Sequence, residues 1–196
     1  MMSRQSHFRP LHICALFAAL CLLLTGCGAQ PKTLLDRMQA LHLPAEAYTS
    51  ADSASAEAPQ LSENDLAAML AGKTIVQGTI LSLEYVRIPL SGSVWYLAAA
   101  VIRTDEVLAG ENVPEQITVA GAAVYTGDGA ETGSGGTPVP AFAGCRTGLS
   151  AVFVLRTVEN TPWQIGLTAV DPASIGEMLL VCCLEPNDPA LVRYFS

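Results

Sequence analysis

The sequence predicts a mainly β protein: a small, closed or partly open antiparallel barrel of five strands with one or two flanking helices. Three observations predict this class. Five segments rich in β-branched or alternating apolar residues follow one another after residue 73. A long segment poor in core-forming residues separates the third from the fourth, and an amphipathic helix precedes the first. Short strands joined by turns in this way are typical of all-β barrels.

The chain begins with features of a cleaved leader. A short polar region carrying Arg4 and Arg9 is followed by an apolar run from Leu11 to Leu24. A helix needs roughly 20 residues to cross the hydrocarbon core of a bilayer, and this run is shorter. A signal peptide over residues 1–26 is therefore favoured over a permanent anchor or a core helix.

The leader ends in Leu24-Thr25-Gly26-Cys27, which resembles the lipobox of bacterial lipoprotein precursors. The resemblance implies cleavage between Gly26 and Cys27 and attachment of acyl chains, such as palmitate, to Cys27. Two or three acyl chains hold a protein at a bilayer far more firmly than one. The implied location is the cell membrane, on its extracytoplasmic side. The alternative is a plain signal peptide followed by an unmodified thiol.

The charge of the chain argues against nucleic-acid binding. Two of the ten Lys and Arg residues precede Cys27, while eighteen Asp and Glu residues follow it, so the part from Cys27 onward has a formal charge of −10. Nucleic-acid binding depends on Lys and Arg neutralising phosphates. The sequence therefore predicts a partner of another kind.

Residues 27–60 are predicted to be a lipid-anchored tether. Thr33–Leu43 has apolar residues at helical spacing and is stopped by Pro44, so it predicts a short helix. This helix either belongs to the tether or docks on the folded domain. Ala45–Gln60 is small, polar and acidic, and it indicates a flexible spacer.

The folded domain is predicted to span residues 61–196. Ser62 is placed to cap a helix over Glu63–Ala71, and Gly72 is placed to end it. The five predicted strands are Thr74–Val86, Val94–Leu108, Gln116–Ala120, Leu149–Val158 and Trp163–Val170.

Several details of these elements carry alternatives. Gly78 predicts a bulge or bend in the first strand. Val94–Leu108 also fits a helix, although its apolar residues favour a strand. Residues 121–148 predict a loop insertion. Ala173–Leu184 fits either a helix or a last strand, and the tail after it is expected to lie along the surface.

A second resemblance concerns Gly72–Val170. The runs IVQGTILSLEY, AVIRTDEVLAGE, ITVAG and LSAVFVL are similar to the netrin-like OB barrels of some exported bacterial proteins, a group related to tissue inhibitors of metalloproteinases. The resemblance implies an OB-like fold, and OB barrels bind oligosaccharides, oligonucleotides or peptides on one sheet face. The inhibitors of that group use a free N-terminal cysteine, whereas Cys27 is expected to carry lipid, so inhibition by that device is not expected.

Catalytic signatures are not found. His42 is the sole histidine after the leader, and Ser150 lacks the second glycine of a nucleophile elbow. The glycine-rich stretch 127–136 has no Gly-Lys-Ser/Thr sequence. The acidic residues of 105–115 lack the spacing of a calcium loop and are expected to be solvated. The sequence therefore predicts no enzymatic activity, catalytic residue, metal or cofactor.

Three cysteines follow the tether: Cys145, Cys182 and Cys183. No C-x-x-C spacing or nearby histidine accompanies them, so a zinc site is not expected. Outside the cytoplasm, a disulfide from Cys145 to Cys182 or Cys183 is predicted to pin the insertion to the barrel. The alternative is that all three are buried, reduced residues.

Trp95 and Trp163 form the one candidate ligand-stacking pair, since exposed tryptophans bind sugar rings; the alternative is that both belong to the core. The predicted function is that of a lipid-anchored lipoprotein presenting a small domain that binds a protein or glycan partner. The alternatives are an envelope hydrolase using Asp and Glu, and a structural envelope component. Two carboxylates converging in a cleft would favour the hydrolase.

Overall fold

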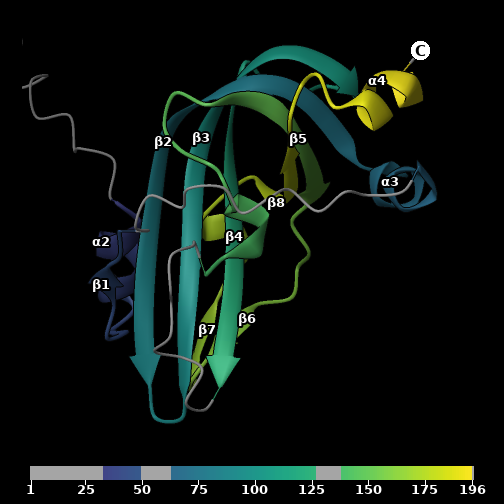
Figure 1. Ribbon diagram of the computed structural model, residues 1–196. Coiled ribbons are helices and arrows are strands. Elements are labelled where there is room, and N and C mark those ends of the chain that lie inside the picture. Colours follow the sequence, from purple (N-terminus) through teal and green to yellow (C-terminus); the bar gives the residue numbers. More distant parts are fainter. Residues whose placement is uncertain (1–32, 50–62, 127–137, 196) are drawn as a thin grey trace, which may run out of the picture. The chain divides into compact units, whose positions relative to one another are not determined.

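The computed structural model describes residues 33–49, 63–126 and 138–195 (Figure 1). The predicted signal peptide, the cleavage site at Gly26 and Cys27, the Ser62 cap and most of the spacer lie outside the described residues. Within the described ranges, no helix has both the length and the apolar character required to cross a membrane.

The protein is mainly β with few helices, as the sequence predicts. The helices are α2 (Leu34–Ala40), α3 (Glu63–Leu70) and α4 (Pro189–Phe195), with 3-10 turns at Pro140–Phe142 (η2) and Pro172–Ser174 (η3). The strands are β1 (Glu46–Ala47), β2 (Thr74–Leu90), β3 (Ser93–Ala109), β4 (Gln116–Thr126), β5 (Ser150–Thr157), β6 (Trp163–Ile165), β7 (Thr168–Val170) and β8 (Met178–Leu184).

Six strands form one sheet in the order β1-β2-β3-β4-β8-β5, and β5 also pairs with the first residues of β2. The pairings therefore run in a cycle through β2, β3, β4, β8 and β5. Strand direction cannot alternate all the way round a cycle of five, so one neighbouring pair has to be parallel. That pair is β4 with β8, and the expectation of a wholly antiparallel arrangement is wrong at this point.

β2 and β3 form one long hairpin (Figure 1). Two predictions for these strands are confirmed. Val94–Leu108 is strand throughout, and the register of β2 against β3 shifts between Gln77 and Gly78, where the bulge was expected. A Cβ atom on Gly78 would lie 2.4 Å from the backbone oxygen of Arg103. The bulge therefore brings two strand backbones closer than any side chain permits.

The predicted loop over residues 121–148 is wrong at both ends. β4 continues to Thr126, because its residues keep pairing with the first half of β3, from Ser93 to Ala98. At the other end, the turn η2 buries Phe142 completely against Gly121. Small residues in β4 make room for this ring, so both ends of the segment belong to the core.

The predicted strand Trp163–Val170 is also wrong. The chain turns back at Gly166, whose φ of +63° places glycine at the first central position of a two-residue hairpin. β6 and β7 make a separate two-stranded sheet, and Leu167 is exposed at its turn. The fifth strand of the cycle is instead β8, so the strand alternative for Ala173–Leu184 is the correct one over its second half.

Helix α2 docks on the domain. Thr33 and Asp36 form a capping box, and Leu34 and Met38 are buried in a core cluster with residues of β2 and β3. The Leu34 amide also donates to Glu84 Oε2 at 2.6 Å. Residues 33–49 therefore pack with the sheet, and the docking alternative holds for this part of the predicted tether.

The remaining helices cover the end of the sheet where β2 begins. α3 lies where the sequence predicts it, and Gly72 follows it with φ +66°. α4 was not predicted; the tail was expected to lie along the surface. Its Leu191 is buried together with Leu66 and Leu70 of α3 in a third core cluster, which is distinct from the first one around Phe142 and the second one around Leu34.

Candidate functional site

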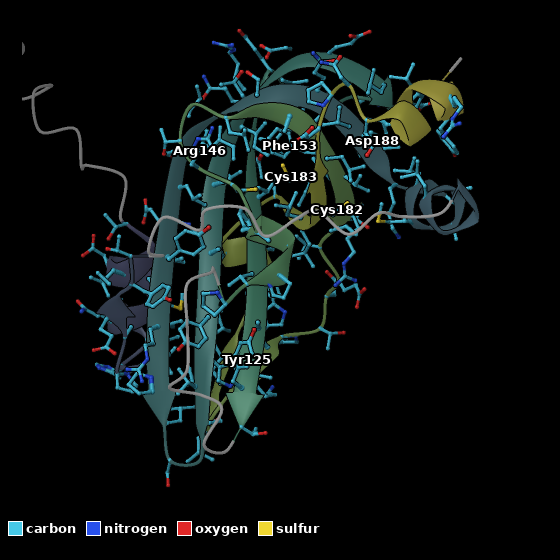
Figure 2. All side chains as sticks on the ribbon, in the orientation of Figure 1. Tyr125, Arg146, Phe153, Cys182, Cys183 and Asp188 are labelled. Atoms are coloured by element: carbon cyan, nitrogen blue, oxygen red, sulfur yellow. The ribbon has the colours of Figure 1, made fainter. Side chains whose placement is uncertain are left out.

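A groove of about 580 Å³ lies beside the middle of β2. We call it the Tyr48 groove and define it by its lining residues: Thr33, Leu35, Ala47, Tyr48, Thr49, Leu83, Glu84, Tyr85, Val86, Cys145, Arg146 and Thr147. These residues come from four segments that are distant in the sequence: α2 with its cap, β1 with its continuation, β2, and the loop before β5. Arg146 is labelled in Figure 2.

The groove occupies a gap in the pairing of β2. On one side, β1 pairs with Val86 and Arg87, and the Tyr48 amide extends this ladder by donating to the Tyr85 carbonyl at 3.1 Å. On the other side, Ile80 exchanges hydrogen bonds of 3.0 and 2.8 Å with Leu149 and Gly148. Neither β1 nor β5 reaches the residues between them.

Leu83 lies at the centre of this gap. Alternate residues of a strand direct their N–H and C=O groups toward the same edge, so Leu83 faces the same way as Tyr85. Among the described residues, no strand partner covers that edge of Leu83. Within the described part of the chain, the groove floor therefore has one backbone donor and one backbone acceptor that lie outside the strand ladders.

Tyrosines make the aromatic wall of the groove. Tyr48 contacts Tyr85 and Tyr96 edge to face, with ring centroids 6.5 and 5.3 Å apart. The series continues from Tyr96 to Tyr125 at 5.7 Å and from Tyr85 to Phe142 at 6.3 Å. Edge-to-face contacts of this kind add to the stabilisation from burial alone. The wall is therefore anchored in the core through Phe142 and Tyr96.

The charged groups near the groove set its chemistry. An ion pair joins Arg87 to Glu46 of β1, and the hydrogen bond that the guanidinium donates to this carboxylate raises the pKa of Arg87. Burial, with a further contribution from Tyr96, raises the pKa of Tyr48, while Arg87 opposes that shift. Tyr48 therefore stays a neutral phenol, suited to hydrogen bonding and stacking.

Glu84 and Arg146 bring opposite charges to the groove lining, and both are exposed. The Glu84 carboxylate accepts the amide hydrogen of Leu34, so it also holds α2 in place. Arg146 follows the buried Cys145 directly, which fixes the start of its side chain at the groove wall. The groove thus combines an aromatic wall, an open backbone edge and a guanidinium group.

The tryptophans proposed as a stacking pair lie elsewhere. Trp95 and Trp163 are both half-buried, and both pack against the second core cluster together with Ile165 and Val170. Neither lines the Tyr48 groove. Local sequence patterns do not single out Tyr48, Tyr85 or Arg146, because these residues come together only when four separate segments meet.

The three cysteines are free thiols in the structure. Cys145 is buried and lines the groove, and its pKa is raised, first by its hydrogen bond to Cys183 and then by burial. The same hydrogen bond lowers the pKa of Cys183. Cys182 lies apart from this pair: its Sγ is 3.5 Å from Met69 Sδ, and burial raises its pKa to about 11.

Among the acidic residues of the β3 to β4 region, Asp105 pairs with a basic and a hydroxyl group. Asp105 accepts hydrogen bonds from Arg103 Nε at 2.9 Å and from the Thr79 hydroxyl at 3.1 Å. The Arg103 guanidinium lowers the pKa of this carboxyl. Within residues 33–49, 63–126 and 138–195, no group of three or more His, Cys, Asp or Glu side chains is placed to hold a metal ion.

Comparison with known proteins assigns this chain to no family. The chain matches no protein-family model, and neither the curated proteins nor the solved structures give a significant match.

Proposed function

We propose that this protein is a bacterial lipoprotein, anchored in the cell membrane through Cys27, whose β domain binds a protein or glycan partner in the Tyr48 groove on the extracytoplasmic side. The agreement of polar start, apolar run and Leu24-Thr25-Gly26-Cys27 supports the anchor. The groove supports binding, because its volume of about 580 Å³ lies within the usual range of ligand pockets.

We further infer that the domain is an OB-like barrel. The cycle of five strands with a single parallel pair supports this assignment, as do the long bent β2 and the loop inserted between β4 and β5. OB barrels present one sheet face and its neighbouring loops to their ligands. The Tyr48 groove combines such elements, since a loop borders the exposed part of β2.

The observation that carries the binding proposal is the edge of β2 at Leu83, which no strand of the described residues covers and which Tyr48, Tyr85 and Arg146 border. Backbone groups next to aromatic and guanidinium side chains suit the recognition of an extended polar chain. Glycoside hydrolysis by carboxylates uses two such groups. Among the described lining residues only Glu84 carries one, and Leu34 already occupies it, so the groove favours binding over hydrolysis.

Removing the acceptor thiol tests the anchor. The Cys27→Ala variant is expected to lose the acyl mass that the wild-type chain carries on Cys27, because no other atom at the cleavage site can form the thioether. Intact-mass spectrometry and detergent phase partitioning of the membrane fraction measure this. The Cys21→Ala variant is the matched control, since residue 21 is removed with the leader. Unchanged mass and attachment in Cys27→Ala would contradict the proposal.

Reversing the charge at Arg146 tests the groove. With the chain from residue 27 as bait, the Arg146→Glu variant is expected to retain any envelope partner at least tenfold more weakly, because a lost charged hydrogen bond costs about 1.5–3 kcal/mol. Arg156→Glu is the control: it makes the same charge change at an exposed residue outside the groove, where Arg156 pairs only with Glu159. Equal retention by both variants would rule the groove out as the binding site.

A further inference from the structure

The adjacent cysteines of β8 have opposite environments. Successive side chains of a strand point to opposite faces of the sheet, so Cys182 and Cys183 cannot face the same neighbours. Cys183 packs against the first core cluster, which contains Cys145 and Phe153. Cys182, which is labelled in Figure 2, packs against the third cluster. Its sulfur lies 3.5 Å from Met69 Sδ of α3.

This alternation selects one partner for Cys145. Cys145 is buried in the first core cluster, and Cys183 packs against that same cluster. Cys183 stands opposite Phe153 in the β5–β8 ladder, and Cys145 lies in the loop that leads into β5. Cys182 stands opposite Val154, on the other face of the same ladder. The fold therefore places Cys145 beside Cys183 and keeps it from Cys182.

We propose that Cys145 and Cys183 form a disulfide in the mature protein and that Cys182 remains a thiol. The bond would tie the loop 145–147, which is one wall of the Tyr48 groove, to the central strand β8. It would hold Arg146 at the groove without any change in the course of the sheet, because Cys145 and Cys183 already lie at the same core cluster.

The chemistry requires an oxidant, and a low-molecular-weight disulfide such as oxidised glutathione supplies it. Cys183 is the attacking group: it is more exposed than Cys145, and its hydrogen bond from Cys145 lowers its pKa. Its thiolate attacks one sulfur of the oxidant, forms a mixed disulfide and releases one glutathione. The Cys145 sulfur then loses its proton and displaces the second glutathione from Cys183. Two protein thiols become one disulfide, and one oxidised glutathione becomes two reduced molecules.

Only the supply of oxidant in the cell rests on the proposed extracytoplasmic location. The test is therefore made on the purified full chain in oxidised glutathione, where the location plays no part. Free thiols are alkylated with one reagent, the chain is reduced and denatured, and the released thiols are alkylated with a second. Trypsin leaves Cys182 and Cys183 in one peptide, 157–193, and fragmentation of this peptide in the mass spectrometer between the two cysteines shows which label each carries.

The expected result is the second label on Cys145 and Cys183 and the first label on Cys182. In the Cys182→Ser variant the internal disulfide is expected to form as in the wild type, whereas in Cys183→Ser it is expected to be lost. The wild-type labelling alone is decisive if a variant does not fold. A Cys145–Cys182 bond, or all three cysteines carrying the first label after oxidation, would overturn the proposal.

Discussion

Replacement of Phe142 by alanine is expected to lower the free energy of unfolding by about 3–5 kcal/mol. The ring is fully buried in the first core cluster, and it fills the space that Gly121 leaves open in β4. Its removal creates a cavity bordered by strand backbone, which cannot move in to fill it. Urea denaturation of wild type and variant, followed by tryptophan fluorescence, measures the loss.

Two variants control for this result. Phe142→Leu retains most of the buried apolar volume and is expected to cost well under half as much as the alanine variant. Phe195→Ala removes the same ring from α4, where it is 39% exposed, and is expected to cost about 1 kcal/mol or less. A loss at Phe142 no greater than that at Phe195 would mean that η2 does not contribute to the core as described. Because Phe142 contacts Tyr85, the alanine variant is also expected to weaken the groove wall.

Replacement of Gly78 by alanine is expected to cost about 3 kcal/mol, which is at the upper end for overpacking. The added Cβ would meet the backbone oxygen of Arg103 at 2.4 Å and Ile102 Cγ2 at 2.9 Å. The side chain of Ile102 has other rotamers, but the carbonyl of Arg103 belongs to the β3 ladder. The bulge would have to open, which would weaken the pairing of β2 with β3 on one edge and with β5 on the other. Thermal and urea unfolding measure the change.

Gly72→Ala is the matched control for Gly78→Ala. Gly72 has a positive φ of 66°, and no atom lies within 4 Å of an added Cβ. Alanine there is therefore expected to lower the free energy of unfolding through backbone strain alone, by about 1 kcal/mol. The larger loss at Gly78, whose φ is not positive, isolates the steric contribution. If the two variants lost equal stability, the close approach of β2 and β3 would not be a determinant of the fold.

The location of the groove follows from the length of β2. Its seventeen residues pair with β5 at the start and with β1 near the end, and the register shift against β3 between Ile80 and Ser82 bends it between the two. A strand bent in this way cannot keep both neighbours in contact along its whole edge. The stretch around Leu83 therefore pairs with neither β1 nor β5, and it forms the floor of the groove.

The sequence alone determined the elements whose signals are local. Alternation and β-branched residues identified β2, β3 and β5, and glycine identified both the bulge at Gly78 and the end of α3. The mainly β class followed from these. The lipobox resemblance at Cys27 is of the same local kind, and it stays a prediction because the described residues begin at Thr33.

Only the tertiary structure decided the features that join distant segments. The continuation of β4 depends on pairing with β3, and the choice of strand for β8 depends on the space between β4 and β5. The Tyr48 groove and the placement of Cys145 and Cys183 at one core cluster arise in the same way, each from segments that local patterns treat separately. A local pattern reports which face of an element is apolar, but the partner on that face is chosen by the packing of the whole chain.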